Sequence, residues 1–424
     1  MLSYYQDGEL ICQKTYDFGF REVKVEGNKF LVNGKPVKLR GICHHDVHPL
    51  LGRISTPEYE LKDVLLAKEA NINFFRTSHY PPTENFLKLC DQYGIYVEDE
   101  TDVCFVDTWR REPYFPGATQ NDSLYTKESI SRLSEMVQNH KNHPSVIIWS
   151  IANESRYGTN FKKSYDWIKN NEPSRPVIFS YPGMTGDSAD IFDILSMHYP
   201  PIDGTKDEFG SKVVNFNSNK NMPVLCDEMM HNPCYNFRVI KKDPNVREFG
   251  GRGLDQIWAN IYDSESGLGG AIWAMTDEIF MVPDTTAGFK KWWGFDSEPA
   301  LQKFQGPIVG SGEWGITDVW RRRKPEFWNT KKSYTPFKVL KTEFAKSDIT
   351  NSIKIPVYNR FNFTDFNELK IEYTFRGKKH VLKGINLPPH TKGNISIPVK
   401  EIKPGEIIVL EVYDRNNRLI DNII

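Results

Sequence analysis

The sequence carries no excess of either charge. Its 54 lysines and arginines are matched by 55 aspartates and glutamates, which gives a formal net charge of −1 at pH 7. A protein with this balance has no general field with which to collect nucleic acid, and no charged tail predicts a disordered arm. We therefore expect a small molecule or a neutral polymer as the ligand, and no nucleic-acid partner.

Long apolar runs and paired cysteines are also absent. No stretch approaches the roughly 18 continuous apolar residues of a membrane span, so no membrane partner is expected. The six cysteines include no Cys-x-x-Cys pair. Cys43, Cys104 and Cys226 lie in or beside apolar runs, which favours buried free thiols over a disulfide framework.

Aromatic residues are abundant, at 13% of the chain with 10 tryptophans. Such rings fill large cores, and they also stack on sugars because they offer an apolar face beside a polar edge. The chain has 424 residues, enough for a barrel and an accessory domain. Both uses of the aromatic residues remain open at this point.

Eight short apolar runs alternate with helical patterns through the middle of the chain. The runs are continuous rather than alternating, as parallel strands covered on both faces are. One helix is expected over 56–71, starting at Thr56-Pro57, and another over 123–139. This order favours an α/β fold with a (β/α)8 TIM barrel over a doubly wound sheet. The expected strands are 37–43, 73–76, 96–100, 146–150, 177–180, 194–198, 224–227 and 271–274.

The two ends of the chain have a different pattern. Residues 345–424 show short alternating runs, at 369–375 and 407–413, which predict a small all-β sandwich. Residues 8–25 contain one or two strands, too few for an independent sheet. We expect a remnant strand and linker of a preceding β-sandwich over 1–25, a catalytic barrel over 26–343 and an immunoglobulin-like sandwich over 344–424.

Polar residues follow most of the eight apolar runs, where a barrel places its catalytic groups. A single glutamate after a strand is usually a loop charge, but this set would meet at one rim. Glycosidic bonds are cleaved by two carboxyl groups, which lie about 5–5.5 Å apart in retaining enzymes. Glu154 and Glu228, after the fourth and seventh runs, could form such a pair. The other residues of this set include His45, Arg76, His79, Asn153, His198, Tyr199, His231 and Trp273.

Several segments resemble glycoside hydrolase family two, which contains β-galactosidases, β-glucuronidases and β-mannosidases. Ser-Ile-Ala-Asn-Glu-Ser at 150–155 resembles its acid/base signature, and Pro-Val-Leu-Cys-Asp-Glu-Met-Met-His at 223–231 its nucleophile segment. Residues 30–36 and 76–81 resemble its first two strand signatures. The resemblance covers about residues 18–340.

The resemblance implies a role for each site residue. Glu154 would be the acid/base and Glu228 the nucleophile. His45 and His79 would contact sugar hydroxyls, Asn153 the 2-hydroxyl, Tyr199 the nucleophile, and Trp273 would form the pocket floor, with Arg76 and His231 also binding substrate. It further implies missing N-terminal β domains, a possible homo-oligomer, and a periplasmic or extracellular location, with the cytoplasm as the alternative.

The sequence departs from the family at two places. Cys104 and Val106 stand where β-galactosidases bind magnesium through Glu and His, so we expect no metal and no cofactor. The Asn-x-Lys motif of β-glucuronidases is replaced by Ser-Gly-Glu-Trp-Gly at 311–315, where Glu313 would repel a uronate. A neutral β-glycoside is therefore expected, most simply a β-galactoside. The alternatives are a mannoside, fucoside or arabinoside, and a non-catalytic carbohydrate-binding barrel.

Overall fold

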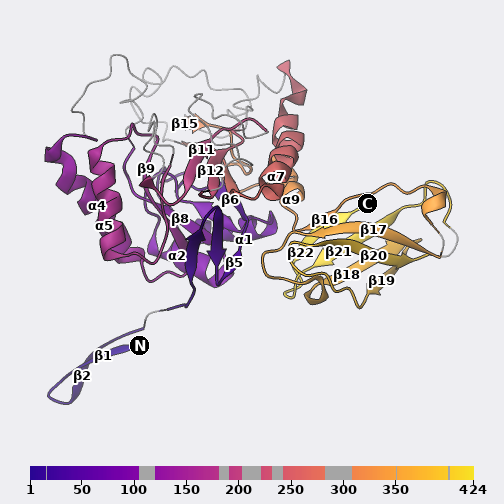
Figure 1. Cartoon of the computed structure of the whole chain (residues 1–424), viewed down its shortest axis with the longest axis horizontal. Helices are drawn as coiled ribbons and strands as arrows, with labels where there is room; N and C mark the ends of the chain where they lie inside the picture. The colour runs from indigo at the N-terminus through magenta and orange to yellow at the C-terminus, as the bar shows by residue number, and fades with distance from the viewer. Residues whose placement is uncertain are drawn as a thin grey trace.

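The computed structural model of the chain describes residues 1–15, 17–104, 120–180, 191–202, 221–231, 242–281, 308–349, 351–399 and 402–424. An N-terminal hairpin, a helix-covered barrel and a β-sandwich follow one another (Figure 1). The hairpin pairs β1 (Leu2–Gln6) with β2 (Glu9–Lys14) and projects from the barrel on an extended linker (Figure 1). Among the described residues, no helix is long and apolar enough to cross a membrane.

Eight parallel strands form the barrel, in the order β10-β9-β8-β7-β6-β13-β12-β11. Between the two end strands, the backbone N–H of Asp193 donates to the carbonyl of Val177 at 3.0 Å. The predicted TIM barrel is thereby confirmed. The strands are β6 (Leu39–Cys43), β7 (Phe74–Arg76), β8 (Tyr96–Glu100), β9 (Val146–Asn153), β10 (Val177–Ser180), β11 (Leu195–His198), β12 (Val224–Met229) and β13 (Gly267–Ile272).

The last barrel strand differs from the prediction, which placed it at 271–274. β13 instead begins at Gly267, in a glycine-rich segment that close neighbours require. A Cβ on Gly269 would lie 2.2 Å from the carbonyl oxygen of Leu39, and one on Gly270 would lie 2.5 Å from Sδ of Met229. Glycines, which allow this close approach, therefore stand in place of the apolar residues by which a strand is recognised in a sequence.

Helices pack around the barrel. The predicted start at Thr56-Pro57 is confirmed, because Thr56 caps α1 by accepting from the N–H of Tyr59 at 3.4 Å. The second predicted helix corresponds to η1 and α4. The described helices are α1 (Pro57–Glu69), α2 (Glu84–Tyr93), η1 (Ser123–Tyr125), α4 (Thr126–His140), α5 (Thr159–Asn171), η3 (Pro244–Glu248), the π-helix η4 (Phe249–Gly253), α7 (Leu254–Asp263), α9 (Pro325–Ser333), η6 (Lys346–Asp348) and η7 (Phe366–Glu368).

Two small sheets accompany the barrel. β3 (Val23–Glu26), β4 (Lys29–Val32) and β5 (Lys35–Pro36) form an antiparallel sheet. Phe30 and Val32 of this sheet pack with Leu39, Phe74 and Leu225 of the barrel strands, so the sheet is joined to the barrel core. The second sheet pairs β14 (Glu278–Met281) with β15 (Ile308–Gly312), and β14 follows closely after β13.

The C-terminal unit is a sandwich of two sheets, ordered β16-β17-β20 and β19-β18-β21-β22. The predicted runs at 369–375 and 407–413 are strands β18 and β21. The domain limits of the sequence analysis remain a proposal, although β16 pairs with β17 and so joins the sandwich before residue 344. The strands are β16 (Phe337–Val339), β17 (Ser352–Asn359), β18 (Lys370–Phe375), β19 (Lys378–Leu382), β20 (Lys392–Pro398), β21 (Ile408–Tyr413) and β22 (Leu419–Ile423).

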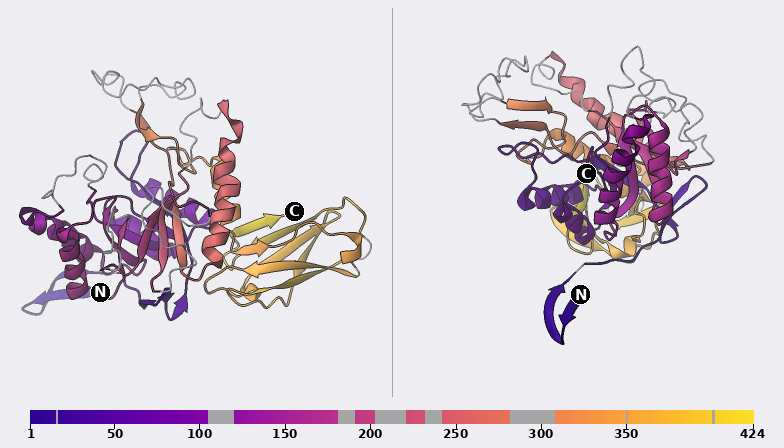
Figure 2. Two further views of the ribbon diagram at one scale, coloured as in Figure 1. Left: turned by 45° about the horizontal axis from the view of Figure 1, so that its top comes forward. Right: turned by 90° about the vertical axis from the view of Figure 1, so that its left-hand side faces the viewer.

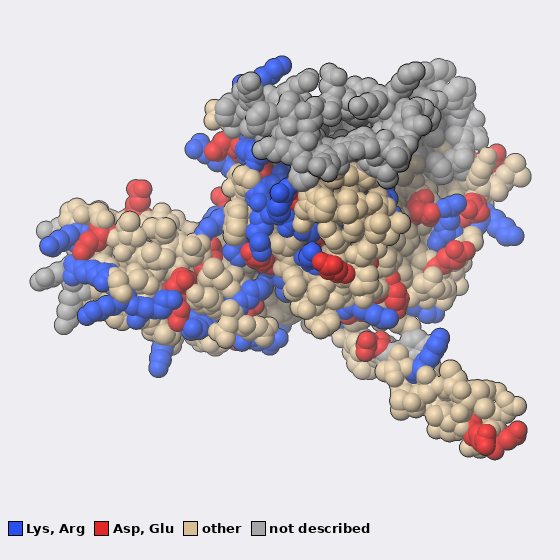
Figure 3. Space-filling view, turned by 180° about the vertical axis from the view of Figure 1, so that it is seen from behind, with Lys and Arg blue, Asp and Glu red and all other residues tan. Residues whose placement is uncertain are grey.

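Helix α7 lies between the barrel and the sandwich (Figure 2). Lys338 Nζ of β16 donates to Oδ1 of Asp255 at 2.8 Å, and the rings of Tyr262 and Tyr358 meet at 5.4 Å. Seen from behind, both charge signs are interspersed over the described surface (Figure 3). This mixture agrees with the balanced composition.

Candidate active site

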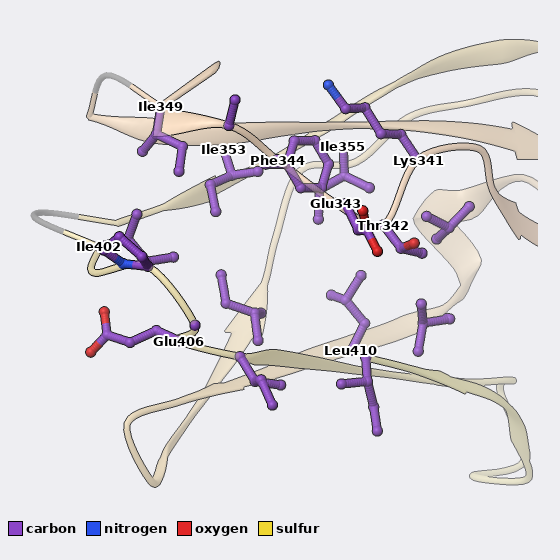
Figure 4. A pocket seen from close by; sticks show the side chains of 18 of the residues that line it. Lys341, Thr342, Glu343, Phe344, Ile349, Ile353, Ile355, Ile402, Glu406 and Leu410 are labelled. Atoms are coloured by element: carbon purple, nitrogen blue, oxygen red, sulfur yellow. The ribbon is translucent and has the colours of Figure 1, made fainter. Parts of the chain in front are cut away.

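Two cavities differ in the chemistry of their walls. One, of about 580 Å³, lies between the sandwich sheets, where Ile353, Ile355 and Leu410 point toward one another (Figure 4). The other, of about 890 Å³, opens at the carboxyl ends of the barrel strands. The second cavity, called the cleft below, is lined by all the predicted site residues except Arg76 and His198: His45, His79, Asn153, Glu154, Tyr199, Glu228, His231 and Trp273. Its polar walls suit a sugar better than the apolar sandwich cavity does.

Two glutamates face each other across the cleft. Glu154 follows β9 and Glu228 lies within β12, and both are buried. A carboxylate oxygen of each lies within 4.8 Å of the other and of a ring nitrogen of His198. The backbone of Glu154 has a positive φ of 35° and that of Tyr199 one of 44°, a conformation that non-glycine residues rarely adopt. Such strain is concentrated at functional sites.

Arg76 lies beneath the cleft and is fully buried. Its Nη1 donates to Oε2 of Glu228 at 2.8 Å, and its Nη2 donates to Oδ1 of Asn153 at 2.7 Å. Its Nε and Nη2 also bind the two oxygens of Glu100 at 3.1 and 3.0 Å. Arg76 therefore fixes the proposed nucleophile and Asn153 from below, which makes it a positioning residue rather than one that lines the cleft.

The surroundings of Glu228 favour its charged form. Burial alone would raise the pKa of this carboxyl, but His198, Arg76 and His79 outweigh it and hold the pKa at about 2. The hydroxyl of Tyr199 also donates to Oε1 of Glu228. Glu228 is consequently ionised at neutral pH and fixed in place, as a nucleophile requires.

His198 is a site residue that the sequence analysis placed at the rim without giving it a role. It is fully buried at the end of β11, and its Nδ1 lies 3.0 Å from Oε1 of Glu154. Burial lowers the pKa of this imidazole, but Glu228, Glu154 and Asp227 together raise it above the ordinary value. The sequence signal was present, since His198 directly precedes Tyr199.

The cleft is also lined by two residues that the sequence analysis missed, Arg53 and Glu278. Glu278 is 4% exposed, and its Oε1 lies 3.3 Å from Nε2 of His45. Nη1 of Arg53 lies 3.3 Å from Nδ1 of the same histidine. Both ring nitrogens of His45 therefore face protein groups, so the ring also holds Arg53 and Glu278 in place.

Aromatic rings make up much of the lining of the cleft. The rings of His79 and Trp273 stack at 5.4 Å with an interplanar angle of 15°, and His45 meets Trp273 edge-on at 5.2 Å. His231 packs against Tyr199 at 5.7 Å and against Trp314 at 4.9 Å. Aromatic rings beside polar groups suit the apolar faces and polar edges of a pyranose ring.

Cys104 corrects one expectation, because it is exposed and lines the cleft rather than being buried. Nδ2 of Asn153 points to its Sγ at 3.4 Å. Val106 lies outside the described residues. Within the described ranges, one cluster could hold a metal ion, formed by Glu154, His198 and Glu228. Magnesium prefers a full set of oxygen ligands, and one of the three groups in this cluster is an imidazole, so the cluster fits magnesium poorly.

A parallel barrel with two facing carboxylates at its mouth is typical of barrel glycosidases. The family profile described as "Glycosyl hydrolases family 2, TIM barrel domain" matches residues 23–248, more than half of the chain. The chain belongs to glycoside hydrolase family 2.

Comparison with individual proteins is consistent with this family assignment. A β-galactosidase from Pectobacterium atrosepticum is 39% identical over 185 residues, which are 44% of this chain and 17% of that protein. A family 2 β-galacturonidase from Eisenbergiella tayi, solved with galacturonate, is 26% identical with a TM-score of 0.56, over 75% of this chain and 54% of that one. A β-D-glucuronidase from Dictyoglomus thermophilum shares the fold at 21% identity, with a TM-score of 0.59 over 77% and 56%. The chain thus spans about half the length of these solved relatives.

Proposed function

We propose that the chain is the catalytic part of a retaining β-glycosidase, with Glu228 as nucleophile and Glu154 as acid/base. The observation that carries this proposal is that a carboxylate oxygen of Glu154 lies within 4.8 Å of a carboxylate oxygen of Glu228. Retaining enzymes place their carboxyl groups about 5–5.5 Å apart, whereas inverting enzymes need about 6.5–9.5 Å to admit a water molecule. The short distance therefore favours retention.

The reaction would proceed by double displacement. Glu228 attacks the anomeric carbon while Glu154 gives its proton to the glycosidic oxygen, so the aglycone leaves as an alcohol and a glycosyl ester forms. Glu154, now ionised, takes a proton from water, which attacks the anomeric carbon and releases Glu228. Hydrogen bonds from Arg76 and Tyr199 keep the nucleophile charged and aligned between the two steps.

Among sugars, we infer a neutral β-glycoside, with a β-galactoside as the first choice. The Pectobacterium relative carries the name β-galactosidase, and the cleft presents the carboxylate of Glu278 to the sugar. Mannosides, fucosides and arabinosides remain alternatives. The solved relatives described above are named for uronates, so a uronate is a further candidate substrate. The carboxylate of Glu278 disfavours it. A non-catalytic carbohydrate-binding barrel is less well supported, since both carboxylates are present and held in place.

Three further expectations remain part of the proposal: additional β domains that complete the sugar site, a homo-oligomeric state, and a periplasmic, extracellular or cytoplasmic location. We also propose that neither a cofactor nor a resident metal takes part.

The test is hydrolysis of 4-nitrophenyl β-glycosides by the purified protein, followed by proton NMR of the first sugar released. We expect β-galactose to appear first and then to mutarotate. Release of the α-anomer would show inversion and refute the nucleophile role of Glu228. Turnover of another neutral glycoside in place of the galactoside would correct the sugar but leave the mechanism intact.

A further inference from the structure

One acidic side chain faces the proposed sugar pocket without a part in the double displacement. Glu278 begins β14, soon after Trp273, and it lines the cleft together with His45 and His79. It is 4% exposed. A carboxylate so buried is costly unless several donors hold it, so its partners indicate what it does.

Three donors surround this carboxylate. Nη2 of Arg53 donates to its Oε2 at 3.1 Å, and Nε1 of Trp314 donates to its Oε1 at 3.1 Å. Nε2 of His45 lies 3.3 Å from the same Oε1. Burial raises the pKa of Glu278, while Arg53 and the Trp314 indole oppose that rise. The side chain is thus fixed at the pocket wall by these three contacts, although the net effect of its surroundings is to raise its pKa.

We propose that Glu278 is a specificity-determining residue that selects neutral sugars and excludes uronates, an inference that rests on the proposed glycosidase function. A fixed carboxylate accepts hydrogen bonds from sugar hydroxyls but cannot donate one to a substrate carboxylate. Two like charges placed together in a desolvated site cost several kcal/mol. The selection therefore comes from repulsion of the wrong substrate as well as from attraction of the right one.

Arg53 gives the proposal a second part. A guanidinium at a sugar pocket is well suited to bind a uronate carboxylate through two parallel hydrogen bonds. Here one of its nitrogens is bound to Glu278 and another faces His45. Glu278 consequently acts twice, since it repels the uronate and also occupies the arginine that would otherwise bind it.

The sequence analysis assigned the repulsion of uronates to Glu313, and the structure offers a different residue. The described residues that line the cleft include Trp314 but not Glu313. The backbone carbonyl of Glu313 accepts from Nζ of Lys324 at 2.8 Å. Glu313 therefore provides a matched control, because the same Glu→Gln change there removes one negative charge without altering the cleft wall.

The experiment compares wild type, Glu278→Gln and Glu313→Gln on 4-nitrophenyl β-galactoside and 4-nitrophenyl β-galacturonide, which differ only at C6. The quantity measured is the galactoside-to-galacturonide ratio of kcat/KM. In wild type the ratio should be large. Glu278→Gln should lower it by about tenfold or more, which corresponds to about 1.4 kcal/mol. Glu313→Gln should leave it unchanged, and adding Arg53→Gln to Glu278→Gln should remove the gain in galacturonide turnover.

Binding gives a readout that needs no turnover. Calorimetric titration with galactose and with galacturonate should show the same preference in wild type and the same loss in Glu278→Gln. Circular dichroism and the Tm of each variant confirm that it is folded. Equal binding of the two sugars to wild type, or ratios that Glu278→Gln leaves unchanged, would refute the proposal. Failure of turnover with this binding preference intact would instead count against the proposed hydrolysis.

Discussion

His198 connects the two proposed catalytic carboxylates, with its Nδ1 lying 3.0 Å from Oε1 of Glu154 and 3.8 Å from Oε2 of Glu228. On its other side, Nε2 lies 3.0 Å from Oγ of Ser180 and 3.7 Å from Oδ1 of Asp227. The imidazole is therefore surrounded by acidic groups on both sides. Because these groups outweigh burial, the pKa of His198 is raised and its charged form persists to higher pH.

This arrangement predicts an ionisation in the pH profile of kcat/KM. We expect it on the alkaline side of the ordinary histidine pKa of about 6.5, because the carboxylates stabilise the imidazolium. The His198→Asn variant should lose this ionisation and about 10²-fold in kcat/KM, the lower end of the range typical of groups that assist proton transfer. The measurement is the full pH profile of both proteins.

His48 supplies the control for this profile, since it is not among the described residues that line the cleft. The His48→Asn variant should keep the alkaline ionisation of wild type. An unchanged profile in His198→Asn would show that His198 is not the group responsible for the alkaline ionisation.

The buried contacts of Arg76 predict that replacing this residue will strongly lower the free energy of unfolding. It binds Glu228 and Glu100 directly, and its Nε lies 3.8 Å from Oε1 of Glu98, which is fully buried. Replacing Arg76 with methionine would remove the buried guanidinium that Glu228 and Glu100 share in the barrel interior. We expect the free energy of unfolding to fall by about 3–5 kcal/mol, as for other broken buried ion pairs. Urea denaturation at pH 7 measures this change.

The exposed Arg132 provides a control for this prediction. Arg132 binds Asp102 at 2.5 Å and Glu128 at 2.9 Å on the surface. The Arg132→Met variant should lose about 1 kcal/mol or less, because solvent screens such pairs. Similar losses in the two variants would mean that Arg76 does not balance the buried charges.

The sequence was sufficient for the barrel, because buried parallel strands leave continuous apolar runs that need no tertiary information. It also predicted which strand ends meet, and in the structure Glu154, Glu228 and Tyr199 line one cleft. β13 was misplaced because its glycines are required by the close approach of Leu39 and Met229, which no local pattern reveals.

The missed residues share a physical cause. The proposed role of Glu278 depends on its contacts with Arg53, Trp314 and His45, which come from three separate segments of the chain. A sequence shows the acid but not the donors that fold around it. Cys104 was misjudged for a related reason, since its neighbours in sequence are apolar but its neighbours in space line an open cleft.

The lowered pKa of Glu228 predicts how stability responds to acid. The carboxyl pKa changes from 4.5 to about 2 on folding, so its ionised form stabilises the native state above pH 4.5. That contribution is lost as the pH falls toward 2. The stability difference between wild type and Glu228→Gln should therefore shrink by on the order of 2 kcal/mol between pH 6 and pH 3, at about 1.4 kcal/mol per pKa unit.

Denaturation curves at several pH values measure this difference. Glu58 pairs with Lys62 on the exposed surface of α1, where solvent screens the pair, so the difference between wild type and Glu58→Gln should change much less across the range. A constant difference between wild type and Glu228→Gln would mean that Glu228 has the same pKa in the folded and unfolded chains.

The last prediction separates the roles of the two glutamates. Glu228→Gln should abolish turnover of every substrate, because no covalent intermediate can form without the carboxylate. Glu154→Gln should retain the first step for substrates with activated phenol leaving groups, which need little protonation, and lose about 10²–10⁴-fold with alkyl glycosides. Stopped-flow release of 4-nitrophenol and steady-state rates distinguish these outcomes.

Added azide then tests which step Glu154 serves. In Glu154→Gln the glycosyl ester would accumulate, because no base activates water. Azide needs no deprotonation, so it should attack the ester, restore turnover and give a β-glycosyl azide, whose configuration follows from two successive inversions at the anomeric carbon. In Glu228→Gln, azide could attack only the substrate itself, from the face that the nucleophile left, and would give the α-azide. A β-azide from Glu228→Gln together with an α-azide from Glu154→Gln would mean that the two glutamates have the opposite roles.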